Sequence, residues 1–286
     1  MRLQSAMEYL MTYGWAILII AVVLGALFEL GFFNSSAFAP KIGPGSCQVY
    51  RPQGPGTTAF ESLEGTCNNE LPQYAALFSS GSSSAIEIPG GYSNTIIAPF
   101  TVTGWIDNTN SASAGNGQGV FGSWWGLTID TSNTLRFWTA AYGNNGGGGF
   151  INKGEWYFIA AVISSPVNPT ITVYLDGAQV SQFSYANTLN GCPEYYIGNG
   201  EGNACSVGTT FNGFLSNFQV YNASLSSNEI LALYQEGIGG VPISLNSLQG
   251  WWPLNGNAND YSGSQNNGVP TGVTYSTGWS AGYTAP

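Results

Sequence analysis

The sequence contains no histidine, and only 7% of its 286 residues are charged, against roughly a quarter in a typical soluble domain. The absence of histidine excludes Ser-His-Asp and Cys-His catalysis, histidine-ligated zinc or haem, and the usual titration switch near neutral pH. Basic residues are also scarce, since five lysines and arginines stand against fifteen acidic residues and give a net charge of −10. Because nucleic-acid binding needs a basic surface to hold phosphates, this balance excludes nucleic acid as a partner.

Cysteine is rare too, with four residues in two pairs. Neither pair has the C-x-x-C spacing of zinc ribbons or redox motifs. Four cysteines allow three connectivities, and the short intervening segments rich in glycine, asparagine and proline favour two local disulfides, Cys47 with Cys67 and Cys192 with Cys205. Such disulfides imply an oxidising compartment outside the cytoplasm.

Glycine and aromatic residues are abundant. Forty glycines accompany nine tryptophans, sixteen tyrosines and fifteen phenylalanines. From about residue 74 onward, apolar or alternating runs such as FTVTGWI, LRFWTAAY and TITVYL are separated by polar clusters such as NTNSASAGNGQG. This spacing predicts an all-β sandwich or barrel.

Two local motifs in this region have specific structural meaning. Asp176-Gly177, between TITVYL and AQVSQF, predicts a two-residue hairpin turn in which both positions accept positive φ. Ser226 and Glu229 form a capping box for one short helix, which ends at Gly237 and whose apolar face is made by Ile230, Leu233 and Tyr234.

The N-terminal part carries an uncharged apolar run, Tyr9–Phe28, between Glu8 and Glu29. Twenty helical residues at about 1.5 Å each reach roughly 30 Å, the thickness of the hydrocarbon core of a bilayer. A secretory signal would have a shorter run and a small-x-small cleavage site after it, so we expect a retained transmembrane helix. Arg2 before the run and the cysteines after it predict a cytoplasmic short end, with the bulk of the chain outside the cell.

The first residues, Met-Arg-Leu-Gln-Ser-Ala-Met-Glu-Tyr, resemble the start of archaeal type IV pilins, whose class III signal peptides are cut by a prepilin peptidase. The resemblance implies a leader over residues 1–3, a cut between Leu3 and Gln4, and Glu8 at the fifth mature position. A carboxylate at the start of an apolar helix is costly in lipid unless it is paired, and in pilin-like filaments it meets the freed amine of a neighbouring subunit. Residues 4–33 would therefore form a transmembrane and assembly helix. Leu3 departs from the small residue more usual before the cut, and a plain single-pass anchor is the alternative.

Residues 34–73 have no periodic apolar pattern and are rich in proline, glycine and serine. This composition indicates a stalk, which a Cys47–Cys67 disulfide would stiffen, although a small cap on the following domain is an equal alternative.

The region from about residue 75 to 236 resembles the laminin-G-like, concanavalin-A-like jelly roll. The motifs that carry this resemblance are K-G-x-W ending at Trp156, Y-x-D-G over Tyr174–Gly177 and F-x-G-x-L-x-x-F-x-V-Y over Phe211–Tyr221. Residues 248–279 look like the first strand and loop of such a domain, yet they follow the rest, so the order looks permuted. We expect residues 74–286 to form one jelly roll that this segment completes, with exchange between subunits as the alternative.

No catalytic centre is expected in this domain. Glucanases on the same fold resemble one another in an E-x-D-x-E strand, which is absent here, and the acidic residues stand singly along the chain. Binding is the favoured activity, and aromatic residues near loops are the candidate sugar contacts, because flat rings pack on the apolar faces of sugars. These candidates are Trp124, Trp125, Trp251 and Trp252. Neighbouring residues of a strand point to opposite faces, so each pair is expected to put one ring in the core and the other outward.

Two further kinds of site are candidates. Laminin-G-like domains often hold calcium, and Asn255, Asn257 and Asp260 offer hard oxygens at alternate positions of one loop, although asparagine and glycine also dominate ordinary turns. Two N-x-S sequons, at Asn34 and Asn222, are candidates for N-glycosylation on the outer side, with unmodified loop asparagines as the alternative.

Together these features predict an archaeal cell-surface protein. Its N-terminal helix lies in the membrane and self-associates in a pilin-like filament, and its jelly roll is a head for adhesion to glycans or to a partner cell. A non-polymerising single-pass lectin with the same head is the second hypothesis, and a surface glycan hydrolase is the third.

Overall fold

The structure is a computed structural model that describes residues 17–25, 47–50, 60–64, 71–79, 83–89, 98–109, 117–139, 143–189, 194–200 and 208–286. The chain divides into two units, Met1–Ile42 and Gly43–Pro286.

The described part of the first unit is a helix over residues 17–25, all of whose side chains are exposed. Among the described residues, no helix is both long enough and apolar enough to cross a bilayer. The expected leader, the cleavage residues Leu3 and Gln4, and Glu8 lie outside the described residues.

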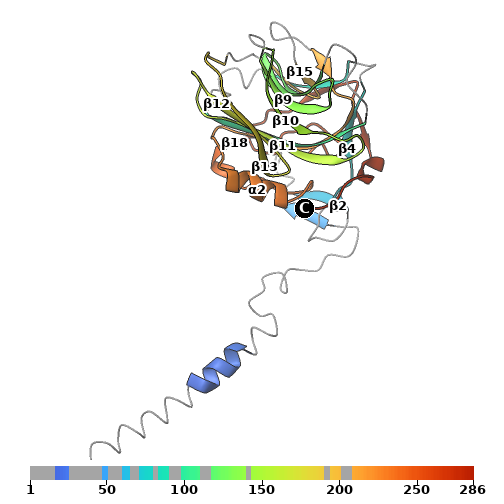
Figure 1. The fold of residues 1–286 in the computed structure, drawn as a ribbon. Coiled ribbons are helices and arrows are strands. Elements are labelled where there is room, and N and C mark those ends of the chain that lie inside the picture. Colours follow the sequence, from blue (N-terminus) through green and yellow to red (C-terminus); the bar gives the residue numbers. More distant parts are fainter. Residues whose placement is uncertain are drawn as a thin grey trace, which may run out of the picture. The chain divides into compact units, whose positions relative to one another are not determined.

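The second unit is a sandwich of antiparallel sheets (Figure 1), as the strand spacing predicted. Within the described residues, one sheet has seven strands, in the order β10 (Gly143–Phe150), β9 (Thr134–Thr139), β8 (Trp125–Ile129), β7 (Gln118–Gly122), β14 (Tyr195–Ile197), β5 (Ala85–Ile88) and β19 (Val269–Thr271). The other has eight, in the order β13 (Ala178–Ser184), β12 (Thr170–Leu175), β11 (Trp156–Ile163), β6 (Phe100–Asn108), β17 (Gly213–Tyr221), β4 (Ala75–Phe78) and β20 (Thr274–Ser276), with β18 (Leu248–Trp252) also paired to β17.

Two small sheets complete the described strands. One contains β1 (Cys47–Tyr50), β2 (Phe60–Glu64) and β3 (Leu71–Pro72), and it occupies part of the segment predicted as a stalk. The other pairs β15 (Asn199–Gly200) with β16 (Thr209–Thr210). This second hairpin lies against β7, because a Cβ added at Gly119 would come within 2.1 Å of the Gly200 nitrogen.

Between the two large sheets lies one apolar core. Strand β9 illustrates how the sequence builds it, since Leu135 and Phe137 are fully buried whereas Arg136 and Trp138, which alternate with them, are only half-buried. A strand that faces a core on one side has this alternation, and its second set of side chains lies on the outer face of the sheet.

The outer face of the eight-stranded sheet is also covered. A second apolar cluster combines Trp105 and Phe158 from the sheet with Ile230 and Leu233 from helix α2 (Ser227–Gln235) and with Trp279 near the C-terminus. The central strands β6 and β11 are consequently buried on both faces.

Both local motifs formed as predicted. Ser226 and Glu229 make the reciprocal hydrogen bonds of a capping box, and Gly237 follows the helix with a φ of 77°. Asp176 and Gly177 have φ angles of 48° and 75° and connect β12 to β13.

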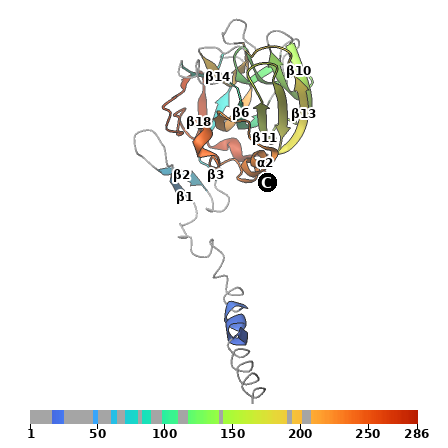
Figure 2. The same ribbon diagram turned by 90° about the vertical axis from the view of Figure 1, so that its left-hand side faces the viewer.

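The C-terminal segment that looked permuted joins both sheets of its own chain. Strand β18 pairs with β17, β19 forms the edge of the seven-stranded sheet beside β5, and β20 forms the edge of the other sheet beside β4. A 3-10 turn, η6 (Gly278–Ser280), then places Trp279 so that its indole N–H donates to the Pro72 carbonyl at 3.1 Å. Figures 1 and 2 both show the C-terminus beside α2.

Candidate functional site

The four tryptophans predicted as sugar contacts do not form an exposed group. Trp251 and Trp252 are 3% and 1% exposed, so the expectation that one of them points to solvent is wrong. They do lie on opposite faces of β18, but this strand belongs to the sheet whose two faces are both covered. Trp125 is buried in the core, and Trp124 is half-buried and packs against it.

The loop predicted to bind calcium does not fit a cation site. Asp260 is completely buried, and its carboxylate accepts hydrogen bonds from the N–H groups of Trp251, Ser262 and Asn266 and from the Ser262 hydroxyl, at 2.8 to 2.9 Å. The amide oxygens of the two asparagines turn to different donors, Asn255 to the N–H of Tyr74 and Asn257 to the N–H of Asn259. Asp260 therefore organises the loop, and the side-chain oxygens of the three residues accept from different N–H groups.

The remaining predicted sites are only partly described. Asn222 is exposed in the loop between β17 and α2, while the hydroxyl of its sequon partner Ser224 donates to the Ile163 carbonyl at 2.9 Å. Asn34 lies outside the described residues. So do Cys67, Cys192, Cys205 and the side chain of Cys47, and both disulfides therefore stay predictions.

The outer face of the seven-stranded sheet presents a different group of side chains. Of the eight tryptophans in the described residues, Trp138 is the one that belongs to neither apolar cluster and packs against neither. Arg136 precedes it by two residues on β9, so both side chains lie on this face. On β10, Phe150 is directly opposite Thr134 and is 59% exposed. We call Trp138, Arg136 and Phe150 the β9–β10 strip.

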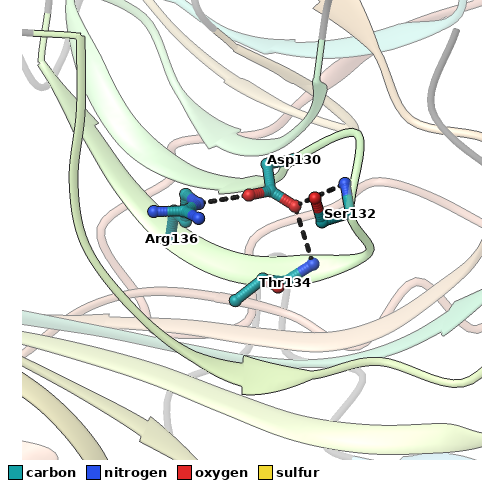
Figure 3. A network of polar contacts seen from close by, with 4 residues as sticks. All are labelled: Asp130, Ser132, Thr134 and Arg136. Atoms are coloured by element: carbon teal, nitrogen blue, oxygen red, sulfur yellow. Dashed lines mark hydrogen bonds and ion pairs between the residues drawn. The ribbon is translucent and has the colours of Figure 1, made fainter. Parts of the chain in front are cut away.

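A hydrogen-bond network fixes the centre of this strip (Figure 3). Asp130 directly follows β8, and its Oδ1 accepts from the backbone N–H groups of Ser132 and Thr134 at 2.8 and 2.9 Å. Its Oδ2 accepts from Nε of Arg136 in an ion pair. Burial would raise the pKa of Asp130, but the hydrogen bonds from Thr134, Arg136 and Ser132 outweigh it and hold the pKa below its usual value.

The glycines of β10 explain why the strip is accessible. A Cβ added at Gly147 would lie 2.8 Å from Nη1 of Arg136, which shows that the guanidinium extends across this glycine. Gly146 and Gly148 serve packing instead, because added Cβ atoms there would meet Phe183 and the Val180 carbonyl of β13. The glycine-rich strand thus closes one edge of the sandwich, and the β10 residue opposite Arg136 is a glycine that adds no side chain over the guanidinium.

Across the sheet, one row of directly opposed residues continues from the strip. Trp138 is opposite Gly126, Gly126 opposite Gly122, Gly122 opposite Tyr196, and Tyr196 opposite Glu87. The row therefore has aromatic rings on β9 and β14 with two glycines between them, but Tyr196 is 8% exposed and all residues of β7 and β8 are buried, so the accessible part of the row is at Trp138.

Glu87 and Asp130, two acidic residues of this face, are too far apart for paired catalysis. Glu87 on β5 and Asp130 at the end of β8 are separated by three strand spacings, roughly 14 Å. Glycoside cleavage places its two carboxyls roughly 5 to 10 Å apart. The buried acid with the most perturbed pKa, Asp107, lies on the outer face of the other sheet, where burial raises its pKa to about 6.

The β9–β10 strip was not among the sites predicted from the sequence. The segment LRFWT does contain a pattern that indicates this strip. Its leucine and phenylalanine lie on one face of the strand, and its arginine and tryptophan lie together on the other face. The predicted sugar contacts were pairs of adjacent tryptophans. Two neighbours on a strand point to opposite faces, but the sequence does not show which of these faces other elements cover.

Two antiparallel sheets around one core, with the C-terminal segment closing an edge of each, define a jelly-roll sandwich of the laminin-G-like kind. A family model described as the concanavalin A-like lectin/glucanases superfamily matches residues 80–231, more than half of the chain. The chain belongs to this superfamily. Among curated proteins, none matches the sequence.

Similarity to one solved structure supports the same fold. A protein from Bacteroides ovatus whose proposed role is carbohydrate binding superposes with a TM-score of 0.57 at 17% identity, over 76% of this chain and 66% of that protein. The chain thus spans about two thirds of the length of that relative. A heptameric SAP-like pentraxin from Limulus polyphemus is similar at a TM-score of 0.48 and 16% identity, over 71% of this chain and 94% of the pentraxin.

Proposed function

We propose that this chain is a surface protein of the archaeal pilin type whose jelly-roll head binds glycans through the outer face of the seven-stranded sheet. The observation that carries the glycan part is Trp138, a large ring outside both apolar clusters, with Arg136 and Phe150 beside it. Flat aromatic surface next to fixed hydrogen-bond donors is what sugar recognition uses. The superfamily, and a structural relative described as carbohydrate-binding, support the same function.

The helix at residues 17–25 supports the anchoring part of the proposal. Its apolar side chains are exposed on every side, from 50% for Val23 to 66% for Ile17. A helix that is apolar all round needs lipid or neighbouring helices to cover it. The archaeal pilin-like start of the sequence favours both kinds of cover. The helix would then be a membrane anchor and also an assembly element that packs against helices of other subunits.

Glycan binding is tested on the full chain, solubilised in a detergent without a sugar headgroup. Its migration is compared in native gels that contain single polysaccharides, both neutral and acidic. Retardation by at least one of them is expected for the native chain and for the control Leu231→Ala, which removes a 41% exposed side chain from α2. Trp138→Ala is expected to reduce the retardation strongly, as a loss of affinity of about tenfold or more would. A native chain that migrates freely in every gel would refute the glycan-binding function.

The anchoring part is tested by mass spectrometry of the N-terminal peptide of protein taken from the cell surface. A mature start at Gln4 supports prepilin-type processing and assembly through Glu8. A start at Met1, together with the absence of the chain from sheared filaments, favours the non-polymerising surface lectin.

A further inference from the structure

We propose that the β9–β10 strip is selective for uncharged oligosaccharides, and that Asp130 is the positioning residue that makes it so. This inference rests on the glycan-binding function proposed above and names the class of glycan.

The strip has the form of an extended binding surface. Thr134, Arg136 and Trp138 occupy alternate positions of β9, and Phe150 stands opposite Thr134. Four residue steps of about 3.3 Å each place the Trp138 and Phe150 ends roughly 13 Å apart. Both ends are aromatic and the centre is the guanidinium that lies across Gly147. This order of ring, donor and ring fits a linear chain of sugars lying along the strands.

Arg136 provides donors at the centre of the strip. Arginine carries five N–H donors, and Nε–H is used by the Asp130 carboxylate. The groups on Nη1 and Nη2 form the outer edge of the guanidinium, and the side chain is 31% exposed. Because Asp130 already holds the guanidinium in one orientation, a ligand does not have to bear the cost of ordering it.

The charge of the strip argues for a neutral ligand. Asp130 cancels the charge of Arg136 at hydrogen-bond distance. Lys153, the other cation among the described residues, lies after β10 in the turn into β11, where its backbone forms an isolated β-bridge with Asn108 of the opposite sheet. Glu87 adds a negative charge to the same face as the strip, and the whole chain carries −10. An acidic glycan would therefore be repelled. The hydroxyls of an uncharged sugar need only hydrogen-bond donors, which the Arg136 guanidinium still provides while Asp130 neutralises its charge.

The test compares neutral with acidic polysaccharides on the full chain in the same detergent. The neutral probes are dextran, mixed-linkage β-glucan and galactomannan, and the acidic probes are polygalacturonate and hyaluronate. We expect binding to at least one neutral probe, no binding to the acidic ones, and the same affinity in 50 mM and 500 mM NaCl, because counterion release plays no part. Trp138→Ala and Phe150→Ala are each expected to weaken binding about tenfold or more, as loss of a central aromatic contact does.

Two variants test the role of the ion pair. Asp130→Asn leaves an acceptor for the loop N–H groups but releases the charge of Arg136, so it is expected to weaken neutral binding and to gain binding to polygalacturonate that salt removes. Gly147→Ala displaces the guanidinium and leaves the pair's charge unchanged, so it is expected to weaken neutral binding without any gain for the acidic probe. Thermal unfolding of each variant separates loss of binding from loss of fold.

The outcomes distinguish this inference from the proposed function. A native chain that binds only acidic probes, or whose binding falls steeply with salt, would overturn the selectivity and leave glycan binding in place. An Asp130→Asn variant that stays folded and gains no acidic binding would remove the positioning role. A native chain that binds no probe would overturn the proposed function itself.

Discussion

Replacing Asp107 with asparagine tests the electrostatics of the head most directly. Asp107 is 3% exposed on the outer face of β6, directly opposite Trp156 on β11 and Phe214 on β17. Among the described residues its Oδ1 has no hydrogen-bond partner. Burial raises the pKa of this carboxyl from 3.8 to about 6, against the hydrogen bond from the Gly154 N–H, and the charge of Glu155 adds to the rise.

The sign and size of the effect follow from this pKa. The folded chain binds the proton more tightly than the unfolded chain, so protonation favours the folded state. Stability from Asp107 is fully present below pH 3.8 and is lost as the pH rises to about 6. At about 1.4 kcal/mol per pH unit, the interval from 3.8 to about 6 corresponds to a loss of about 3 kcal/mol. Asparagine has nearly the same shape and no charge, and its side-chain oxygen can still accept from Gly154.

Urea unfolding of the full chain, from pH 4 to pH 8, measures this difference. Asp107→Asn is expected to unfold like the native chain at pH 4 and to be about 1 to 3 kcal/mol more stable at pH 8. The control Glu155→Gln removes an exposed charge near Asp107 and is expected to change stability much less. The reasoning fails if Asp107→Asn is the less stable chain at pH 8, or if its difference from the native chain is the same at both pH values.

Three further substitutions test the fold. Gly148→Ala is expected to lower the free energy of unfolding by about 2 kcal/mol or more, because its Cβ would lie 2.1 Å from the Val180 carbonyl oxygen. Gly147→Ala is expected to cost less, because the atoms nearest to its Cβ all belong to the flexible Arg136 side chain, and urea midpoints of the two variants compare them. Asp260→Ala leaves buried loop donors without an acceptor and is expected to cost about 3 kcal/mol or more in the same assay, and a cost below 1 kcal/mol would contradict its organising role. Ser226→Ala removes the helix cap and is expected to cost about 1 kcal/mol, with circular dichroism as a check that α2 persists.

Elements that depend on neighbouring residues were predictable from the sequence. The Asp176-Gly177 turn and the capping box of Ser226 and Glu229 involve residues at most three positions apart, so their geometry follows from the residue types alone. The all-β class followed from the regular spacing of short apolar runs. The turn, the capping box and the strand class are local properties, and the tertiary structure retains all three.

The site required information that no local pattern holds. Whether Trp251 is exposed depends on α2 and the C-terminal residues, which cover its side of the sheet. Whether Asp260 serves a cation or a loop depends on which backbone N–H groups turn toward it. Arg136 and Trp138 are accessible because, among the described residues, no helix covers the outer face of their strand. The tertiary arrangement decides which strand faces are covered.

The contact between Trp279 and Pro72 has a mechanical consequence. In the proposed surface-displayed protein, tension would enter the jelly roll through Leu71–Pro72, which lead into β4. The Trp279 indole holds the Pro72 carbonyl, and β4 lies between β17 and β20 with hydrogen bonds to both. A force along β4 therefore has to shear the hydrogen bonds to β17 and to β20 at the same time, and it does not peel a single edge strand from the sheet. Trp279 thus fastens the jelly roll at the point where tension would enter it in the proposed arrangement.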